Sequence, residues 1–342
     1  MDFSQKVNHA IDDMAKPRNS LGLLEKYIKK AFEVWGSFCS ELRPFHLIFA
    51  ADNGVTKEAV VKQSPEITYL QTKNMIDGHA TISCFCEINQ IPYKVIDVGV
   101  NHLDTVGVDY KAAMGTKNFL HAEAMDQQEF LKAFQAGKDM VALAKTEGYN
   151  LISFGEMGIG NTTTSSAVLH ALTDIHPEFI VGYGANQQNP EVIKRKREVV
   201  RAGVALHRPK MQQVEDILRC VGGFDIVAIY AGMLECRNQK LPFVIDGFIT
   251  AVAYACAVRM DAAVEEYAIP SHISREPGMD YALSLGNIES KDVPIRADMA
   301  LGEGTGAIFM VVMLRTMLYA VQHVSKMSEF DQRIAAGKLE GL

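Results

Sequence analysis

The sequence has little positive charge, because 34 lysines and arginines stand against 41 aspartates and glutamates, which gives a net charge of −7. This balance argues against nonspecific binding to nucleic acid or to an anionic membrane surface. We find no apolar run of transmembrane length. The first residues, Met1-Asp2-Phe3-Ser4-Gln5-Lys6, form no signal-peptide core. We therefore expect a cytoplasmic protein that has no nucleic-acid or membrane partner.

Cysteine is sparse, and its six residues are scattered, which predicts reduced and buried thiols rather than a redox site. The closest pair, Cys84 and Cys86, has neither metal-clamp nor thioredoxin spacing. Nothing supplies the second and third ligands of a metal at His272, so a hydrogen-bonded scaffold role is favoured there. Ser165 and Ser166 lie in no nucleophile elbow, which argues against a hydrolase triad. We expect no metal and no cofactor.

The most distinctive stretch runs from residue 155 to residue 166 and reads Gly-Glu-Met-Gly-Ile-Gly-Asn-Thr-Thr-Thr-Ser-Ser. It follows Leu151–Phe154, an apolar run typical of a short buried strand, and precedes a segment compatible with a helix. The free N–H groups of a helix start suit a phosphate, and glycines let the main chain come close. The glycine spacing matches neither the P-loop nor the dinucleotide fingerprint. A phosphate site and a plain tight turn therefore both remain open at this point.

Alternation of strands and helices predicts an α/β fold with a doubly wound parallel, Rossmann-like sheet. Strands are expected at residues 46–51, 93–100, 151–154, 243–245 and 266–269. Residues 3–36 show two helical patterns, and Ser20 is expected to cap the second. Further helices are expected at 67–88, at 126–145, from 190 onward, and at 224–236, 248–258 and 307–321. The segments 101–125 and 180–186 are expected as loops. The large α/β domain is placed at residues 40–310, with residues 1–39 and 311–342 forming a small helical domain.

Polar residues gather in the turns that follow the expected strands, namely Asp52, Glu156, Asp246, His272, Glu276 and Glu303. Glu303 stands between two glycines just before a helix, where a partly buried carboxylate could have a raised pKa and act as a general base. It could equally complement the helix dipole. The basic run 194–197 is either a solvated helix face or the source of one phosphate ligand. Asp52 could belong to a simple turn.

Several segments together resemble the nicotinate-nucleotide:dimethylbenzimidazole phosphoribosyltransferases, the family that activates the lower ligand of cobamides. The matching stretches occur in the family's order over residues 16–310 and are Lys16-Pro17, Ser20-Leu21-Gly22, Ala51-Asp52-Asn53-Gly54-Val55, Gly155 through Thr163, Gly222-Gly223-Phe224, Asp246-Gly247-Phe248, Ser271-His272, Ser274, Glu276-Pro277-Gly278 and Leu301-Gly302-Glu303-Gly304-Thr305-Gly306. The resemblance implies transfer of ribose phosphate from nicotinate mononucleotide to an aromatic base.

The resemblance also assigns roles to residues. It implies that Glu303 is the general base, that Glu156 is a second active-site carboxylate, and that Lys196 holds the nucleotide phosphate with the glycine turn. The substrate-binding residues that it implies are Gly158, Gly160, Asn161, Thr162, Lys196, Asp246, Gly247, Ser271, His272, Gly302 and Asp52. It further implies a homodimer or a heterodimer with a paralogue.

The chain departs from the family pattern at positions that we expect to shape the pocket for the acceptor base. Asn53 stands where the family usually has histidine, and Gln63-Ser64-Pro65-Glu66 replaces a Tyr-Pro-Gln segment. The acceptor could therefore be dimethylbenzimidazole, a related base, or a phenol or cresol used by a heterodimer. A catalytically silent partner subunit is the remaining alternative.

Overall fold

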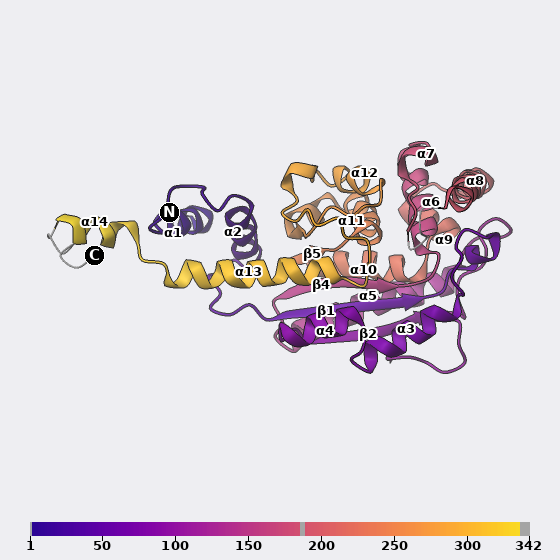
Figure 1. The fold of residues 1–342 in the computed structure, drawn as a ribbon, viewed down its shortest axis with the longest axis horizontal. Coiled ribbons are helices and arrows are strands. Elements are labelled where there is room, and N and C mark those ends of the chain that lie inside the picture. Colours follow the sequence, from indigo (N-terminus) through magenta and orange to yellow (C-terminus); the bar gives the residue numbers. More distant parts are fainter. Residues whose placement is uncertain (1, 185–188, 336–342) are drawn as a thin grey trace.

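The centre of the molecule is a six-stranded parallel sheet in a computed structural model that describes residues 2–184 and 189–335 (Figure 1). The strand order is β3-β2-β1-β4-β5-β6, with β1 Pro44–Ala51, β2 Tyr93–Gly99, β3 Val108–Asp109, β4 Leu151–Met157, β5 Phe243–Ile245 and β6 Ala268–Pro270. The order reverses between β1 and β4, which pair directly. Open α/β sheets bind their ligands at the carboxyl ends of the strands beside such a reversal.

Helices connect the strands and also form both ends of the described chain. Their bounds are α1 Phe3–Asp12, α2 Leu23–Trp35, α3 Glu66–Ile76, α4 Thr81–Ile88, α5 Gln127–Thr146, α6 Asn161–Thr173, α7 Pro177–Ile180, α8 Pro190–His207, α9 Val214–Val221, α10 Phe224–Asn238, α11 Phe248–Met260, α12 Met279–Ser284, α13 Thr305–His323 and α14 Met327–Ala335. Asp126 caps α5, and Pro190 occupies the first turn of α8.

Both faces of the sheet are covered, because alternate strand residues point to opposite sides. On one face, Leu47 of β1 and Phe154 of β4 join a core with residues of α5, α6, α10 and α11. On the other face, Ile48 and Leu151 pack with residues of α1, α2, α4 and α13. The predicted doubly wound parallel α/β fold is confirmed.

The two ends of the chain meet beyond the sheet, where α1 and α2 lie along α13 (Figure 1). The tail also returns to this group, since the backbone N–H of Ala15 donates to the carbonyl of Ser325 at 2.8 Å. By length and composition α13 could cross a membrane, contrary to the expectation from the sequence. More than half of this helix is buried inside the protein, and this burial accounts for its apolar composition.

Several predicted elements need correction. The single helix over 67–88 is two helices, because Gly78 takes a left-handed conformation with φ +81° after α3. Ser20 does not cap α2, which begins at Leu23 after Gly22. The strand over 266–269 is Ala268–Pro270, since a 3-10 helix occupies 262–267. The loops at 101–125 and 180–186 contain β3 and the last residue of α7, and residues 185 and 186 lie outside the described residues.

Candidate active site

A cavity of about 280 Å³ lies at the carboxyl ends of the strands, beside the reversal between β1 and β4. Its wall combines the turn after β4, the turn after β5, the segment after β6 and the loop before α13. Most of the residues predicted for the site line it, namely Glu156, Gly158, Gly160, Asn161, Thr162, Asp246, Gly247, His272, Gly302 and Glu303. Segments that are far apart in the sequence therefore form one site.

Glu303 lies on a short loop of unusual backbone geometry. Its φ is +63°, and Gly302 and Gly304 on either side have φ +86° and +88°. The side chain is 4% exposed, and its Oε1 accepts a hydrogen bond of 2.7 Å from Nε2 of Gln71. Oε2 has no partner of hydrogen-bond geometry among the described residues. Burial raises the pKa of this carboxylate above its usual range, and the backbone N–H of Ile82 acts on the carboxylate by lowering its pKa.

Glu156, the penultimate residue of β4, belongs to a buried group of three polar side chains. Nδ2 of Asn161 donates to Oε2 of Glu156 and, at 3.1 Å, to Oδ2 of Asp225. Burial, with a contribution from the charge of Asp225, raises the pKa of Glu156 to about 8. Burial also raises the pKa of Asp225 to about 6. The site therefore places two interacting carboxylates against one amide.

The turn between β4 and α6 has the predicted form of strand, glycines and helix start. Gly160 caps α6 with φ +91°, and Asn161 is the first helical residue. Lys196 of α8 lies behind this turn rather than on the cavity wall. Its Nζ donates to Oγ1 of Thr162 and to the carbonyl of Gly182, both at 3.0 Å. Burial lowers the pKa of the lysine to about 8.

The segments after β5 and β6 hold the beginning of α13. Oδ1 of Asp246 accepts a hydrogen bond of 2.9 Å from the backbone N–H of Ala307. Ser271 lies beneath the wall, where its Oγ donates to the carbonyl of Asp246 at 3.1 Å and lies 3.0 Å from Nδ1 of His272. Among the residues that the structure describes, no group of three histidine, cysteine, aspartate or glutamate side chains is placed to hold a metal ion.

Asp52 and Asn53 do not line this cavity. Asp52 lies on an adjacent cavity of about 310 Å³, and its Oδ2 accepts a hydrogen bond of 2.7 Å from the backbone N–H of Asn101. Asn53 is buried against the glycine turn, where its Oδ1 accepts a hydrogen bond of 3.1 Å from Oγ1 of Thr164. Gln63, the other departure from the family pattern, does line the cavity near Glu303.

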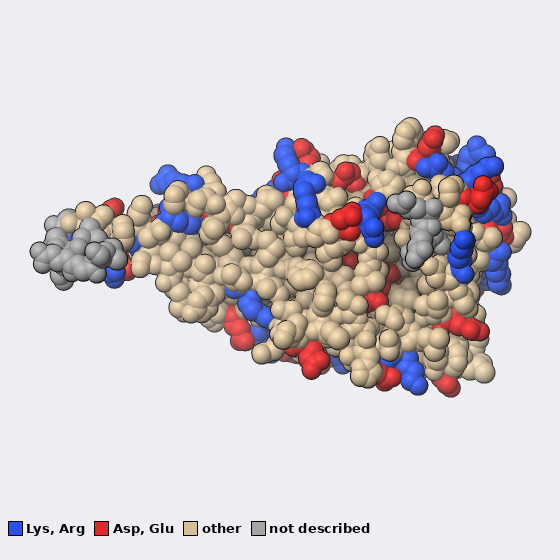
Figure 2. Space-filling model, viewed as in Figure 1, with Lys and Arg blue, Asp and Glu red and all other residues tan. Residues whose placement is uncertain are grey.

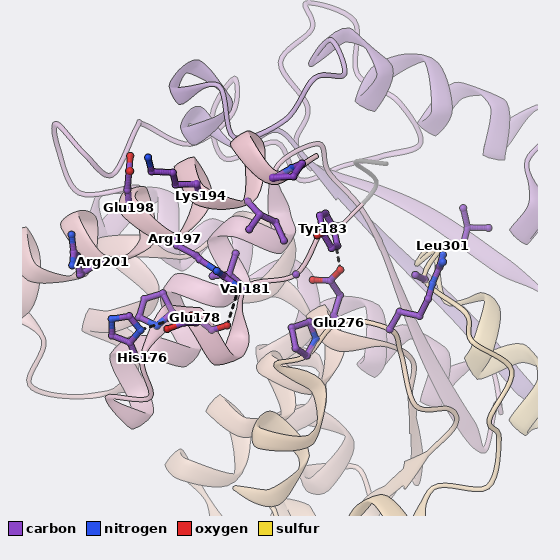
Figure 3. Close-up of a pocket in the computed structure, with 18 residues that line it drawn as sticks. His176, Glu178, Val181, Tyr183, Lys194, Arg197, Glu198, Arg201, Glu276 and Leu301 are labelled. Carbon is purple, nitrogen blue, oxygen red and sulfur yellow. Dashed lines mark hydrogen bonds between the residues drawn. The ribbon is translucent and has the colours of Figure 1, made fainter. Parts of the chain in front are cut away.

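A larger outer cavity of about 1110 Å³ lies between α7, α8 and the segment before α12, and it shares Gly184, Glu276, Ala300 and Leu301 with the first (Figure 3). Its basic lining residues are Lys194, Arg197, Arg201 and Arg275. Lysine and arginine side chains gather at the α8 end of the molecule (Figure 2). The basic run 194–197 is thus divided: two members face this cavity, Arg195 pairs with Glu58, and Lys196 is buried.

Sequence reasoning missed two residues that act on the predicted carboxylates, Gln71 by a hydrogen bond to Glu303 and Asp225 through Asn161, which it shares with Glu156. Gln71 is one polar side chain on α3, and nothing in the spacing of that helix marks it. Asp225 directly follows Gly222-Gly223-Phe224, a stretch that matches the family, and this position could have marked it as a residue of the site.

Fold and site together define an α/β enzyme with a glycine turn suited to phosphate and buried carboxylates at the reversal point of its sheet. The family model DBI_PRT, described as a phosphoribosyltransferase, matches residues 1–334. The nicotinate-nucleotide–dimethylbenzimidazole phosphoribosyltransferase of Acetivibrio thermocellus is 38% identical over 306 residues, which cover 88% of this chain and 86% of the relative. That of Vibrio campbellii is 34% identical over 96% of this chain and 97% of its own.

Solved structures agree with the sequence comparisons. The crystal structure of CobT from Thermus thermophilus matches with a TM-score of 0.89 at 32% identity, covering 96% of this chain and 98% of its own. The protein belongs to the nicotinate-nucleotide:dimethylbenzimidazole phosphoribosyltransferase family, and it is a phosphoribosyltransferase.

Proposed function

We propose that the protein transfers the ribose phosphate of nicotinate mononucleotide to an aromatic base such as dimethylbenzimidazole, giving an α-riboside phosphate and nicotinate for cobamide assembly. The observation that carries this proposal is the Glu303 carboxylate. It is buried at the cavity wall, one oxygen is held by Gln71, and the other has no partner of hydrogen-bond geometry among the described residues. A carboxylate placed in this way can accept a proton from a bound acceptor.

The reaction needs a base but no acid. A ring nitrogen of the acceptor attacks C1′ from the face opposite the nicotinate, and the bond from C1′ to the pyridinium nitrogen breaks. Its electron pair stays on that nitrogen, so nicotinate leaves with a neutral ring. The proton that the acceptor loses passes to Glu303, which contributes typically ~10²–10⁴-fold as a general base. The raised pKa of Glu303 brings it nearer to neutral pH, where such a base is most effective.

Glu156 is the residue that we assign to the ribose side of the site. It lines the cavity and is linked through Asn161 to Asp225. At neutral pH the pair of carboxylates carries its negative charge mainly on Asp225, because the pKa of Asp225 is about 6 and that of Glu156 about 8. This charge would stabilise the positive charge that builds on the ribose ring as the bond to nicotinate breaks. The glycine turn is assigned to the nucleotide phosphate, and Lys196, buried behind it, is assigned to hold Thr162 of that turn and to place a positive charge there.

The two cavities together give the room that the substrates need. Ligand sites usually measure about 300–1,000 Å³, so the inner cavity of about 280 Å³ is small for a nucleotide and an acceptor together. The outer cavity adjoins it at Glu276 and Leu301 and adds room for the nucleotide, and its four basic side chains stand beside the three glutamates Glu178, Glu198 and Glu276. We assign Val61 and Gln63 of the inner cavity to the acceptor side, because they line it from the segment just before α3, the helix that carries Gln71.

The remaining assignments rest on the family resemblance. We propose a cytoplasmic dimer, formed either by two copies of this chain or with a paralogue. We also propose that residues 40–310 form the catalytic domain and that residues 1–39 and 311–342 form a small helical domain. The meeting of α1, α2 and α13 beyond the sheet supports this division. No cofactor enters the reaction that we propose.

The test is an assay of the purified chain with nicotinate mononucleotide and a panel of benzimidazoles, purines and phenols. We expect nicotinate release that depends on a benzimidazole acceptor. Release with phenols alone would assign the protein to phenolic lower ligands. If no acceptor of the panel supports nicotinate release, at protein concentrations that favour a dimer, the proposal is contradicted and a silent partner subunit is favoured.

A further inference from the structure

The backbone of Glu303 adopts a conformation that residues other than glycine rarely take. Its φ of +63° lies in the left-handed region, and the two glycines beside it are left-handed as well. Such a conformation persists only where neighbouring groups determine it. The structure therefore raises the question of which groups hold this loop.

One holding group is an imidazole buried beneath the loop. Nε2 of His46 lies 3.0 Å from the carbonyl oxygen of Glu303, and Nδ1 lies 2.8 Å from Oγ of Ser153. Because a carbonyl only accepts, the proton must be on Nε2, and the hydroxyl of Ser153 then donates to Nδ1. Full burial lowers the pKa of His46 to about 4, which keeps this neutral form at working pH.

The sheet fixes the position of this imidazole. His46 on β1 and Ser153 on β4 are direct partners in the parallel register. The ring contacts the loop closely, because a Cβ at Gly304 would lie 2.1 Å from its Cε1. A Cβ at Gly155 would lie 2.2 Å from the carbonyl oxygen of Glu303. The two glycines therefore permit the contact between ring and loop.

The preceding peptide group is held as well, since the backbone N–H of Glu303 lies beside the carboxylate of Glu156. We propose that His46, oriented by Ser153, is a positioning residue for the reaction, and that its Nε2–H fixes the Glu303 peptide so that the carboxylate faces the acceptor. This inference rests on the proposed function for its kinetic consequence, but its structural part is independent of activity.

Two substitutions separate the hydrogen bond from the packing of the ring. His46→Leu removes the donor, whereas in His46→Gln the side-chain amide can still donate to the Glu303 carbonyl. We expect His46→Leu to lower kcat by about 10- to 100-fold, as misplaced catalytic groups do. The dissociation constant of nicotinate mononucleotide, measured by calorimetry, should change less than about threefold, because its phosphate contacts are unaltered. His46→Gln should recover kcat to within about threefold of the wild type.

His207 offers a matched control, because it is also buried and its Nε2 lies 2.8 Å from a backbone carbonyl, that of Phe119. His207→Leu should lower the melting temperature and leave kcat unchanged. Ser153→Ala is the milder variant if His46→Leu does not fold, and it should lower kcat in the same direction. Hydrogen exchange at the amide of Thr305, which donates to Gly302 at 3.1 Å, reports the order of the loop directly.

Faster exchange at Thr305 in His46→Leu, but not in His207→Leu, is the expected result. Unchanged exchange and unchanged kcat in a folded His46→Leu protein would overturn the proposal. So would a His46→Gln protein as impaired as His46→Leu, since packing rather than the hydrogen bond would then matter. If the wild type itself releases no nicotinate, the proposed function fails, and the exchange measurement still decides the structural part.

Discussion

Asp225 should control the ionisation of Glu156, and replacing it by asparagine should bring the pKa of Glu156 toward its ordinary value. Both carboxylates accept hydrogen bonds from one nitrogen of Asn161, which puts their charges roughly 5 Å apart. At an effective dielectric constant of about 20, such charges repel by roughly 3 kcal/mol, or about two pKa units. Burial and this repulsion raise the pKa of Glu156 to about 8. We expect Asp225→Asn to lower that pKa to about 6.

The pH dependence of stability reports this change. Glu156 keeps its proton in the folded protein up to a pH of about 8, but its ordinary pKa in the unfolded chain is 4.5. Between these values the folded state binds one more proton, so the free energy of unfolding falls by about 1.4 kcal/mol per pH unit. The contribution is complete below pH 4.5 and is lost as the pH rises through the folded pKa. In Asp225→Asn, most of this loss should already be complete at about pH 6.5.

Urea unfolding at about pH 6.5 and 7.5 is the assay, applied to the wild type, to Asp225→Asn and to Glu156→Gln, which lacks the titrating group. Asp225, which is absent from one variant, has a pKa of about 6 and so titrates mostly below this interval. The remaining titrating groups are common to the three proteins and cancel in the comparison. The wild type should lose about 1 kcal/mol more stability over this interval than either variant. Equal losses in the wild type and Asp225→Asn would refute the coupling of the two carboxylates.

Four further outcomes follow from the same geometry. Lys196→Met should raise the KM for nicotinate mononucleotide at least about tenfold and leave the KM for the acceptor unchanged, as saturation kinetics with each substrate would show. Gln71→Leu removes the hydrogen bond that holds Oε1 of Glu303, and it should lower kcat by about tenfold, measured at saturating substrates. Gly302→Ala should lower both activity and melting temperature, because its φ is +86° and a Cβ would lie 2.4 Å from Oε1 of Glu156. In a pH profile, kcat/KM should rise with pH through a pKa above the usual glutamate range, since Glu303 must be ionised to accept a proton.

Local patterns in the sequence predicted the parts of the fold that depend on neighbouring residues. The order of apolar run, glycine turn and helix start at 151–166 predicted β4 and α6, although β4 continues through Glu156 to Met157. Turns after strands also marked most of the cavity wall, because parallel strands end at one edge of a sheet. The strand order did not follow, since it depends on contacts between distant segments.

The residues that the sequence did not reveal act through tertiary contacts. Gln71 reaches Glu303 across 232 positions of the chain, and no local rule connects the two. In the sequence His46 is only part of an apolar strand. Its contact with the carbonyl of Glu303 depends on the fold, which places the loop before α13 over it. The family resemblance predicts Lys196 at the phosphate, whereas the structure places it behind Thr162, buried by its own helix and the glycine turn.

The central claim is that Glu303 accepts the proton from the acceptor. Replacing it by glutamine keeps the shape of the side chain and removes the base. Single-turnover nicotinate release by Glu303→Gln should be slower by about 10²–10⁴-fold. Calorimetry should show binding of nicotinate mononucleotide close to that of the wild type, because the phosphate contacts are unchanged. Near-normal turnover in Glu303→Gln would contradict the account.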